Sequence, residues 1–459
     1  MNKQQQQTRT AIIIGAGLVG SLWAVYLSKA GYAVTIYERR KDLRKTKMSA
    51  GRSINLAMSY RGWKGLDDVG VGDDIRKIAI PMYGRTMHYL DNSTSFQPYG
   101  NNNQAIYSVA RGAINQQLMD IAESHTHTQI HFDEECIDVD LEGGKAVFRN
   151  TQTDAITTAE AEVVFGTDGA FSAVRYQALQ KLDRFNYSQT YIEDGYREIL
   201  LPANPDGSYK MAKETLHIWP RGRFMLIALP NFDGSFTCTL FMPFDNHKYC
   251  FNNLKTKQQV DDFFEDLFPD FYRMMPNVAD EWENHPLSSL AIIRCFPWTH
   301  SKVALVGDAA HATVPFFGQG MNCGFEDCSV LWELMQKHDH NWAAIFKEYE
   351  VLRKPNGDAV QDLSLKNYLV MRDKVADPDF LLTQKIERRI NYLYPESYFP
   401  LYTMVSFTNI AYTTALEKGE AQEAMMRQLI RKNHLTPDTD EATIDRIIHE
   451  FMKTNSSSK

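Results

Sequence analysis

A glycine-rich hexapeptide near the N-terminus, Gly15-Ala16-Gly17-Leu18-Val19-Gly20, constrains the fold more strongly than any other segment. The apolar run at residues 10–14 before it is typical of a buried strand, and residues 18–30 after it are typical of a helix. A second apolar run, at residues 33–38, is typical of another strand. The order of strand, glycine-rich turn, helix and strand predicts a β-α-β unit of a parallel sheet.

Each glycine of this turn has a separate physical task. Gly15 permits the tight turn, Gly17 lets a pyrophosphate approach the backbone, and Gly20 lets the helix pack closely against the strand. The helix N-terminus then faces the anion. Glu38 ends the next strand, where its carboxylate can accept hydrogen bonds from a ribose. Together these residues predict dinucleotide binding, the alternative being an ordinary glycine-rich turn.

Composition excludes several classes of protein. The chain has 459 residues, 44% of them hydrophobic, so it is neither disordered nor a disulfide-stapled miniprotein. Its length predicts about three domains. The net charge of −8 argues against a nucleic acid or an anionic membrane as the main partner. Six scattered cysteines without a C-x-x-C pair are typical of reduced thiols in a cytosol.

Two further motifs end short apolar strands. Gly166-Thr167-Asp168-Gly169 closes the strand at 163–166, and Gly307-Asp308 closes the one at 303–307. A glycine-rich segment at 318–322 follows the second motif. An aspartate at a strand's carboxyl end, with such a helix start after it, suits a ribityl hydroxyl and a flavin ring. Each motif alone could be an ordinary strand-to-helix turn, but three in this order favour a flavin.

The middle and the end of the chain have different patterns. Four apolar segments separated by turn residues predict a β-meander, and they lie at residues 191–200, 216–220, 224–230 and 235–241. A short helix is predicted at 261–264. From about residue 341 the chain is mainly helical, with Pro355 expected to end the first of these helices.

These patterns predict an α/β protein, α+β overall. A Rossmann-like, discontinuous dinucleotide-binding domain would comprise residues 8–80, 101–182 and 290–345. An inserted antiparallel β-sheet substrate domain would comprise 81–100 and 183–289. A helical C-terminal region, 346–459, would close the pocket.

Some side chains attract attention without deciding a function. In residues 82–89 the strand period places Tyr83, Arg85, Met87 and Tyr89 on one face, where the guanidinium would bind a carboxylate or stack on a tyrosine. Asn367 lies on an otherwise apolar helix face and needs a polar partner, from the core or from a ligand. The histidines at 125, 127 and 131 straddle two elements, so no metal site is expected.

The motif order resembles that of the single-component flavoprotein aromatic hydroxylases, and further segments are similar to the kynurenine 3-monooxygenase family. The resemblance covers roughly residues 10–430, and its specific segments are Gly51–Ala57, Gln97–Gly100, Leu216–Pro220, Val314–Asn322, Leu365–Tyr368 and Tyr402–Phe407. The family's Arg-x-x-Leu-Asn reads Arg111-Gly112-Ala113-Ile114-Asn115, which keeps the arginine. Mitochondrial members carry a C-terminal membrane segment that has no counterpart here, so we expect a soluble, cytoplasmic protein without a membrane partner.

The resemblance implies the chemistry. An FAD-dependent monooxygenase would hydroxylate L-kynurenine to 3-hydroxykynurenine through a flavin C4a-hydroperoxide, in tryptophan degradation and NAD biosynthesis. FAD would be tightly but non-covalently bound, with O₂ and NADPH as co-substrates. Since no second G-x-G-x-x-G is present, the reductant would bind transiently, and the residues do not separate NADPH from NADH. No residue is expected to be catalytic, because the flavin carries the chemistry.

The resemblance also implies roles for individual residues. The substrate carboxylate would be bound by Arg85, Tyr99, Asn367 and Tyr402. The ring pocket would be lined by Ile106, Leu216, Met225, Ile227, Phe241, Pro315, Phe316 and Met371. The cofactor would be bound by Gly15, Gly17, Leu18, Gly20, Glu38, Arg39, Arg40, Ala57, Arg111, Cys136, Asp308, Gly320, Met321 and Asn322.

Three alternatives remain open at this stage. The chain could hydroxylate another aromatic acid, or it could be a flavin oxidase or dehydrogenase acting on an amino acid. It could also be a protein of the Rab escort and GDP-dissociation-inhibitor type, which shares the fold without using flavin. The oligomeric state, with a homodimer as one option, is not readable from the sequence.

Overall fold

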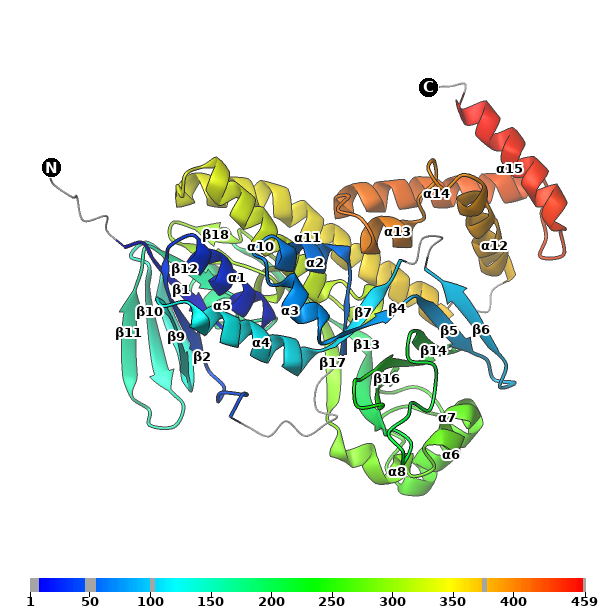
Figure 1. The fold of residues 1–459 in the computed structure, drawn as a ribbon, viewed down its shortest axis with the longest axis horizontal. Helices are drawn as coiled ribbons and strands as arrows, with labels where there is room; N and C mark the ends of the chain where they lie inside the picture. The colour runs from blue at the N-terminus through cyan, green and yellow to red at the C-terminus, as the bar shows by residue number, and fades with distance from the viewer. Residues whose placement is uncertain (1–7, 46–54, 100–103, 374–377, 457–459) are drawn as a thin grey trace.

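The computed structural model describes residues 8–45, 55–99, 104–373 and 378–456. Figure 1 shows a sheet flanked by helices at the left, a second sheet at the lower right and the C-terminal helices at the upper right. The mixed α/β fold with a helical C-terminal region is therefore confirmed.

The first sheet has six strands in the order β18-β19-β12-β1-β2-β8. Its strands are β1 (Thr10–Ile14), β2 (Ala33–Glu38), β8 (Thr128–Phe132), β12 (Val163–Gly166), β18 (Thr299–His300) and β19 (Val303–Leu305). All neighbours are parallel except β18 and β19. Strand β1 is central, so its apolar side chains are buried, which explains the continuous apolar run.

Helices cover this sheet, and they place three chain segments beside one another. The helices are α1 (Leu18–Lys29), α4 (Arg111–Ser124), α5 (Ala173–Gln177), α9 (Asp308–His311) and α10 (Gly320–Lys337). Helix α1 contacts both α4 and α10, although about 90 and 300 residues separate them in the chain. Two short helices, α2 (Tyr60–Asp67) and α3 (Gly72–Arg76), lie alongside, and α2 packs on α10.

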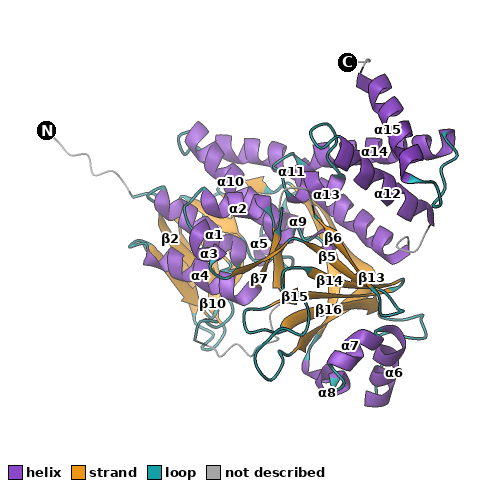
Figure 2. Cartoon of the chain, turned by 45° about the vertical axis from the view of Figure 1, so that its right-hand side comes forward, coloured by secondary structure: helices purple, strands orange, loops and turns teal. Residues whose placement is uncertain are grey.

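The second sheet has seven strands in the order β17-β13-β16-β15-β14-β5-β6. The strands are β5 (Gly84–His88), β6 (Thr94–Pro98), β13 (Asn186–Leu201), β14 (Leu216–Arg221), β15 (Phe224–Pro230), β16 (Phe236–Pro243) and β17 (Leu287–Phe296). The predicted meander is thus confirmed, and only the β14–β5 pair is parallel. One face is covered by α6 (Lys257–Leu267), α7 (Pro269–Met274) and α8 (Val278–Glu281) (Figure 2).

Two small antiparallel sheets complete the β-structure. One has the order β3-β7-β4 and consists of β3 (Asn55–Met58), β4 (Ala79–Met82) and β7 (Ile106–Ala110). The other has the order β11-β10-β9 and consists of β9 (Glu134–Asp140), β10 (Lys145–Asn150) and β11 (Ile156–Glu160). Neither of these two sheets was predicted. Single turns of 3-10 helix occur at η1 (Leu179–Lys181), η2 (Trp282–Asn284) and η3 (Pro315–Phe317).

The long helix α11 (Trp342–Asp373) corrects one prediction. Pro355 does not end the helix but lies inside it. A proline removes one backbone hydrogen bond and disfavours the helix locally, so contacts with the rest of the protein must compensate. Two buried side chains supply them: Arg353 binds the Asp327 carboxylate at 2.7 Å, and Gln361 donates to the Ala312 carbonyl at 2.8 Å.

The C-terminal helices pack around an apolar cluster of their own. They are α12 (Pro378–Leu393), α13 (Leu401–Ser406), α14 (Tyr412–Lys432) and α15 (Glu441–Ser456). Ile386, Ile390, Met426 and Ile448 are buried between α12, α14 and α15. Helix α14 also packs against α11, so the group is attached to the body of the protein. Within the described residues, no helix is both long and apolar enough to span a membrane.

Gly20→Ala should destabilise the fold. A Cβ at Gly20 would lie 2.0 Å from the Gly15 carbonyl oxygen and 2.4 Å from Thr167 Oγ1, both in the crossing of α1 with the sheet. We expect a loss of about 1–3 kcal/mol of folding free energy, measured as a lower melting temperature. An unchanged melting temperature would contradict this close packing.

Candidate functional site

The turn between β1 and α1 is shaped to receive an anion. Gly15 has φ of +104°, and a Cβ there would lie 2.8 Å from the Thr167 carbonyl oxygen, so only glycine fits. A Cβ added at Gly17, by contrast, would have no atom within 4 Å. Gly17 is the N-cap of α1 and offers no capping side chain. The free N–H groups of the first turn are thus open to a ligand phosphate.

Glu38 lies beside this turn at the end of β2. Its side chain is buried and accepts hydrogen bonds from the Ala16 amide at 3.0 Å and from Arg40 Nε at 2.7 Å. Burial would raise the pKa of Glu38, but the bonds from Arg40 and Ala16 outweigh it and lower the pKa. The carboxylate is therefore ionised at neutral pH. Arg39 is exposed next to it.

A second strand end brings Asp308 to the same edge of the six-stranded sheet. Gly307 has φ of +65° and precedes Asp308, which is exposed at the start of α9. Cys136 on β9 is buried, and burial raises the pKa of its thiol to about 12, so it is a neutral packing residue. Its neighbour Asp168 is half-buried, and its buried Oδ1 atom has no hydrogen-bond partner among the described residues. The edge thus carries unused acceptor capacity.

Asn322 fixes the loop that precedes α10. Its side chain is fully buried and donates to the carbonyls of Ala57 at 2.9 Å and Gly318 at 2.8 Å, while Oδ1 accepts from the Ser59 amide. Gly318 has φ of +66°, and a Cβ added there would lie 3.4 Å from the Ala57 methyl. The Asn322 side chain is therefore fully used in joining β3 to this loop, and its backbone is what remains for a ligand.

Arg111, at the start of α4, faces the second sheet. Its charge acts on Tyr196 and Glu198, which are two residues apart in β13 and therefore lie on the same face of the strand. Burial raises the pKa of Glu198 to about 7, although Arg111 opposes the shift. A carboxyl with a raised pKa therefore lies on β13 of the second sheet, close enough to feel the charge of Arg111. Sequence reasoning missed it, although the alternation of Tyr196 and Glu198 in a strand was a signal.

Arg85, Tyr99 and Tyr402 come together in space. The Arg85 guanidinium lies 5.3 Å from the Tyr99 ring centre and 4.3 Å from that of Tyr402, and the two rings stack at 5.2 Å. Burial raises the pKa of Tyr99 well above its ordinary value, so the phenol stays protonated. Arg85 forms no ion pair with an acidic side chain among the described residues. This arrangement leaves a cation available to an anionic ligand.

Asn367 lies at a different point of the same region. Its Nδ2 donates to the Phe316 carbonyl oxygen at 2.6 Å, and no described contact joins it to Arg85. The Phe316 ring packs against Phe241 at 4.9 Å and against Tyr368 at 4.7 Å. Asn367 thus holds one aromatic wall in place.

The predicted pocket residues fall into two touching apolar clusters. One cluster includes Leu216, Met225, Ile227, Phe241 and Phe316. The other joins Leu216 and Ile227 to Ile106, Ala57, Tyr99 and Tyr402. Pro315 is exposed, and the side chain of Met371 lies outside the described residues, as do Gly51–Ile54 and Gly100 of the quoted segments. Phe407 belongs to the second cluster, 5.9 Å from Tyr99, although the sequence assigned it no role.

Comparison with known proteins places this arrangement in a family. Residues 8–364 match the family described as "FAD binding domain". The chain is 46% identical to kynurenine 3-monooxygenase of Flavobacterium psychrophilum, over 97% of this chain and 99% of that protein. It is 41% identical to the Dictyostelium discoideum enzyme of the same name, over 96% and 97%, and 40% identical to that of Sus scrofa, over 93% and 90%. The chain belongs to the kynurenine 3-monooxygenase family.

A solved structure supports the fold. The tetrameric form of 2-methyl-3-hydroxypyridine-5-carboxylic acid oxygenase superposes with a TM-score of 0.65 at 20% identity, covering 81% of this chain and 95% of that one. As a member of the kynurenine 3-monooxygenase family, the protein is an FAD-dependent flavoprotein monooxygenase.

The strand-end residues fit FAD. The uncapped start of α1 and the open space at Gly17 suit a pyrophosphate. The unpartnered Asp168 Oδ1 and the exposed Asp308 suit hydroxyl groups. The four acceptor positions of Glu38 are used by Ala16 and Arg40. A ribose hydroxyl must therefore displace part of Arg40 to reach this carboxylate.

Other groups in this monooxygenase are less suited to ligands. His311, Cys323 and Asp327 could supply three metal-ligand atoms within 4.8 Å. However, the Asp327 carboxylate already binds His311 Nε2 at 2.6 Å and Arg353 Nε at 2.7 Å, and a guanidinium there disfavours a cation. We interpret the cluster as an internal ionic network.

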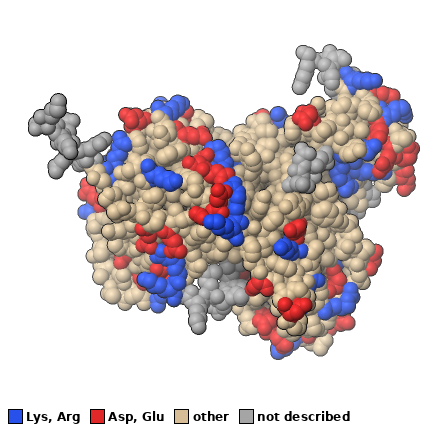
Figure 3. Space-filling model, in the orientation of Figure 1, with Lys and Arg blue, Asp and Glu red and all other residues tan. Residues whose placement is uncertain are grey.

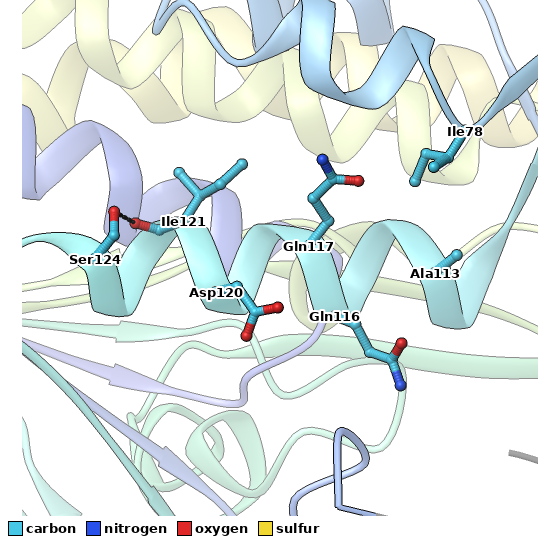
Figure 4. A pocket seen from close by; sticks show the side chains of 7 residues that line it. All are labelled: Ile78, Ala113, Gln116, Gln117, Asp120, Ile121 and Ser124. Atoms are coloured by element: carbon cyan, nitrogen blue, oxygen red, sulfur yellow. Dashed lines mark hydrogen bonds between the residues drawn. The ribbon is translucent and has the colours of Figure 1, made fainter. Parts of the chain in front are cut away.

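A surface depression of about 550 Å³ lies along α4, and none of the predicted site residues lines it. In Figure 4, Gln117 and Ile121 point to the side on which Ile78 lies, whereas Gln116 and Asp120 point away from it. On the face shown in Figure 3, acidic and basic side chains are interspersed. Neither feature indicates a second site.

Gly17→Ala should weaken FAD binding without unfolding the protein. The added methyl meets nothing within 4 Å in the fold, but it occupies the path of the pyrophosphate to the backbone. We expect the Kd for FAD to rise roughly tenfold or more, which is about 1.4 kcal/mol. Flavin fluorescence titration measures it, with the melting temperature of the apoprotein as control. A variant that purifies with full flavin content would contradict this role.

Proposed function

We propose that this protein hydroxylates L-kynurenine to 3-hydroxykynurenine, with FAD as cofactor and NADPH and O₂ as co-substrates. The observation that carries the proposal is the Arg85 guanidinium flanked by the Tyr99 and Tyr402 rings, beside two touching apolar, aromatic clusters that would line the predicted pocket. Kynurenine has a charged amino-acid end and an aromatic amine ring, and this pocket is complementary to both.

In this proposal Arg85 binds the substrate carboxylate through two parallel N–H···O bonds. The phenol hydroxyls of Tyr99 and Tyr402 donate further hydrogen bonds, and Asn367 completes the binding set. The Tyr99 hydroxyl is buried beside Arg85 and Tyr402, so a carboxylate bound to Arg85 would lie within its reach. Anchoring one end of the substrate fixes the direction in which its ring points.

The chain's own contribution is to bind, orient and exclude water. The reduced flavin supplies the activation of O₂ when it is bound. The walls, including Leu216, Phe241 and Phe316, would keep the substrate ring in an apolar space. No side chain is required as a catalytic acid or base, because the ring amine of kynurenine activates its own ortho carbon toward an electrophilic oxygen.

We also propose the cofactor assignments and the domain division. Gly15, Gly17, Leu18 and Gly20 would form the pyrophosphate loop. The other cofactor residues would be Glu38, Arg39, Arg40, Ala57, Arg111, Cys136, Asp308, Gly320, Met321 and Asn322. The FAD domain would be 8–80, 101–182 and 290–345, and the substrate domain 81–100 and 183–289. Strand β17 crosses the boundary proposed at residue 290. Residues 346–459 would close the pocket.

A cytoplasmic location is part of the proposal. All six cysteines are buried and unpaired, which suits a reducing compartment. The proposed partner is L-kynurenine, without a nucleic acid or a membrane, and a homodimer is the assembly to test first.

The decisive measurement is NADPH oxidation by the flavin-loaded protein with and without L-kynurenine. We expect kynurenine to accelerate NADPH consumption and the product to gain one oxygen atom by mass. Phenolic acids and other aromatic acids serve as alternative substrates. Hydroxylation of one of these instead of kynurenine would replace the proposed substrate, and NADPH consumption without any hydroxylated product would exclude a hydroxylase.

Arg85→Ala should raise the kynurenine requirement while FAD stays bound. A charge-assisted pair contributes about 1.5–3 kcal/mol, so we expect KM to rise between about tenfold and a hundredfold. Arg85→Lys keeps the charge but loses the bidentate geometry and should give an intermediate value. Kynurenine affinity equal to that of the wild type in a titration of the Ala variant would remove Arg85 from the binding set.

A further inference from the structure

Arg61 is a charged side chain buried in the joint between the α10 region and the C-terminal helices. It extends from α2, and its side chain has no solvent exposure. Its Nε donates to the Val405 carbonyl at 3.2 Å, and one Nη donates to the Ile410 carbonyl. The other Nη binds Glu326 on α10 at 2.5 Å. One guanidinium therefore holds both sides of the loop that joins α13 to α14.

Glu326 belongs to a longer buried chain of charges. Its second oxygen accepts from Arg353 on α11 at 2.7 Å, and Arg353 in turn binds Asp327 at 2.7 Å. Two cations and two anions thus alternate across α2, α10 and α11. Burying ion pairs contributes little to stability on balance, but it fixes a single arrangement of the elements that carry them. Through the Arg61 bonds to Val405 and Ile410, this row of charges therefore fixes the position of α13 and of the loop that follows it.

Tyr412 connects the same joint to the loop before α10. Its ring packs under the Arg61 guanidinium at 4.0 Å, and its hydroxyl donates to Gln319 Oε1 at 3.0 Å. Burial raises the pKa of Tyr412 well above its ordinary value, so the hydroxyl remains a donor. Gln319 is buried, and its carbonyl accepts the first backbone bond of α10, from Cys323. The Tyr412 hydroxyl therefore helps to set the turn between η3 and α10.

The Arg61–Val405 and Tyr412–Gln319 contacts each hold a segment that carries predicted substrate-pocket residues. Val405, held by Arg61, lies in α13 three residues after Tyr402, whose ring stacks on Phe317 at 5.7 Å and faces Arg85. Gln319, held by Tyr412, follows Phe317 and Gly318 in the loop clamped by Asn322. Neither Arg61 nor Tyr412 belongs to the apolar clusters that form the pocket walls.

We propose that Arg61 and Tyr412 are positioning residues for the hydroxylation: Arg61 holds Tyr402 and Tyr412 holds Gln319 on two sides of the pocket. This rests on the proposed function. Correct placement of Tyr402 keeps the substrate carboxylate on Arg85. Correct placement of Gln319 keeps the loop before α10 closed against water. Loss of either contact leaves FAD bound but lets reducing equivalents end as H₂O₂ instead of hydroxylated product.

Tyr412→Phe and Arg61→Lys test the two contacts. Tyr412→Phe keeps the ring under Arg61 and removes only the bond to Gln319. Arg61→Lys keeps the charge beside Glu326 and loses the fork that reaches two carbonyls. The matched control is Tyr398→Phe, which removes a buried hydroxyl bonded to Glu387 at 3.1 Å within the C-terminal helices, remote from Gln319.

The measurements are H₂O₂ formed per NADPH oxidised, KM for kynurenine, bound FAD and melting temperature. For Tyr412→Phe we expect H₂O₂ per NADPH to rise about twofold or more, with FAD content unchanged. For Arg61→Lys we expect KM to rise about tenfold as well. Tyr398→Phe should lower the melting temperature by a similar amount to Tyr412→Phe without changing H₂O₂ formation.

A double variant separates positioning from general loosening. If Tyr412 acts through Gln319, then Tyr412→Phe should add nothing to the H₂O₂ ratio of Gln319→Leu. Additive effects would overturn the Tyr412 assignment. An unchanged ratio of H₂O₂ to NADPH in Tyr412→Phe would overturn it too. So would an equal rise of this ratio in Tyr398→Phe. A KM for kynurenine in Arg61→Lys equal to that of the wild type would overturn the Arg61 assignment, and a variant that does not fold would show that Arg61 is needed for the fold and is not only a positioning residue. Failure of the wild type to hydroxylate kynurenine would instead reject the proposed function.

Discussion

The Asp327 carboxylate joins parts of the chain on which both halves of the site depend. It accepts the Gly307 amide at 2.9 Å, His311 Nε2 at 2.6 Å and Arg353 Nε at 2.7 Å, entirely out of solvent. Burial would raise the pKa of Asp327, but the charges of His311 and Arg353 lower it to about 2, so it is an anion at neutral pH. Removing one partner would leave an uncompensated buried charge. The strand-end turn before Asp308 and the long helix α11 are therefore fixed by the same group.

The second sheet uses its two faces for different purposes. Arg85 and Met87 of β5 face the pocket, while His88 of the same strand faces α7. There His88 bonds to Asp270 at 2.8 Å and to His217 Nδ1 at 2.8 Å. Because His217 donates from Nε2 to the Ala212 carbonyl and burial lowers its pKa to about 4, its Nδ1 is the acceptor. The strand that carries Arg85 is thus held from behind by hydrogen bonds as well as by the stacking of His88 on Trp219, whose ring centres lie 4.0 Å apart.

Local sequence signals predicted the parts of the fold that depend on neighbouring residues. Strands β1, β2, β12 and β15 have the expected bounds, because each is a continuous apolar run. The helical C-terminal region was also visible. The sheet of β9, β10 and β11 was missed because its strands are exposed over much of their length and contain charged residues instead of a continuous apolar run. Pro355 was misread because its compensating contacts come from residues far away in the chain.

The site shows the same division for a different physical reason. Glu38 and the glycine turn were predictable because each acts through the backbone next to it. Arg61 was not, since an arginine in a short helix gives no local sign that its carbonyl partners lie more than 340 residues later. Arg85 stands between these cases. Strand periodicity placed it beside aromatic residues, but only the fold shows that no described acid neutralises it. A chain with net charge −8 therefore keeps one cation available inside the pocket, and the substrate carboxylate is the group whose binding would neutralise it.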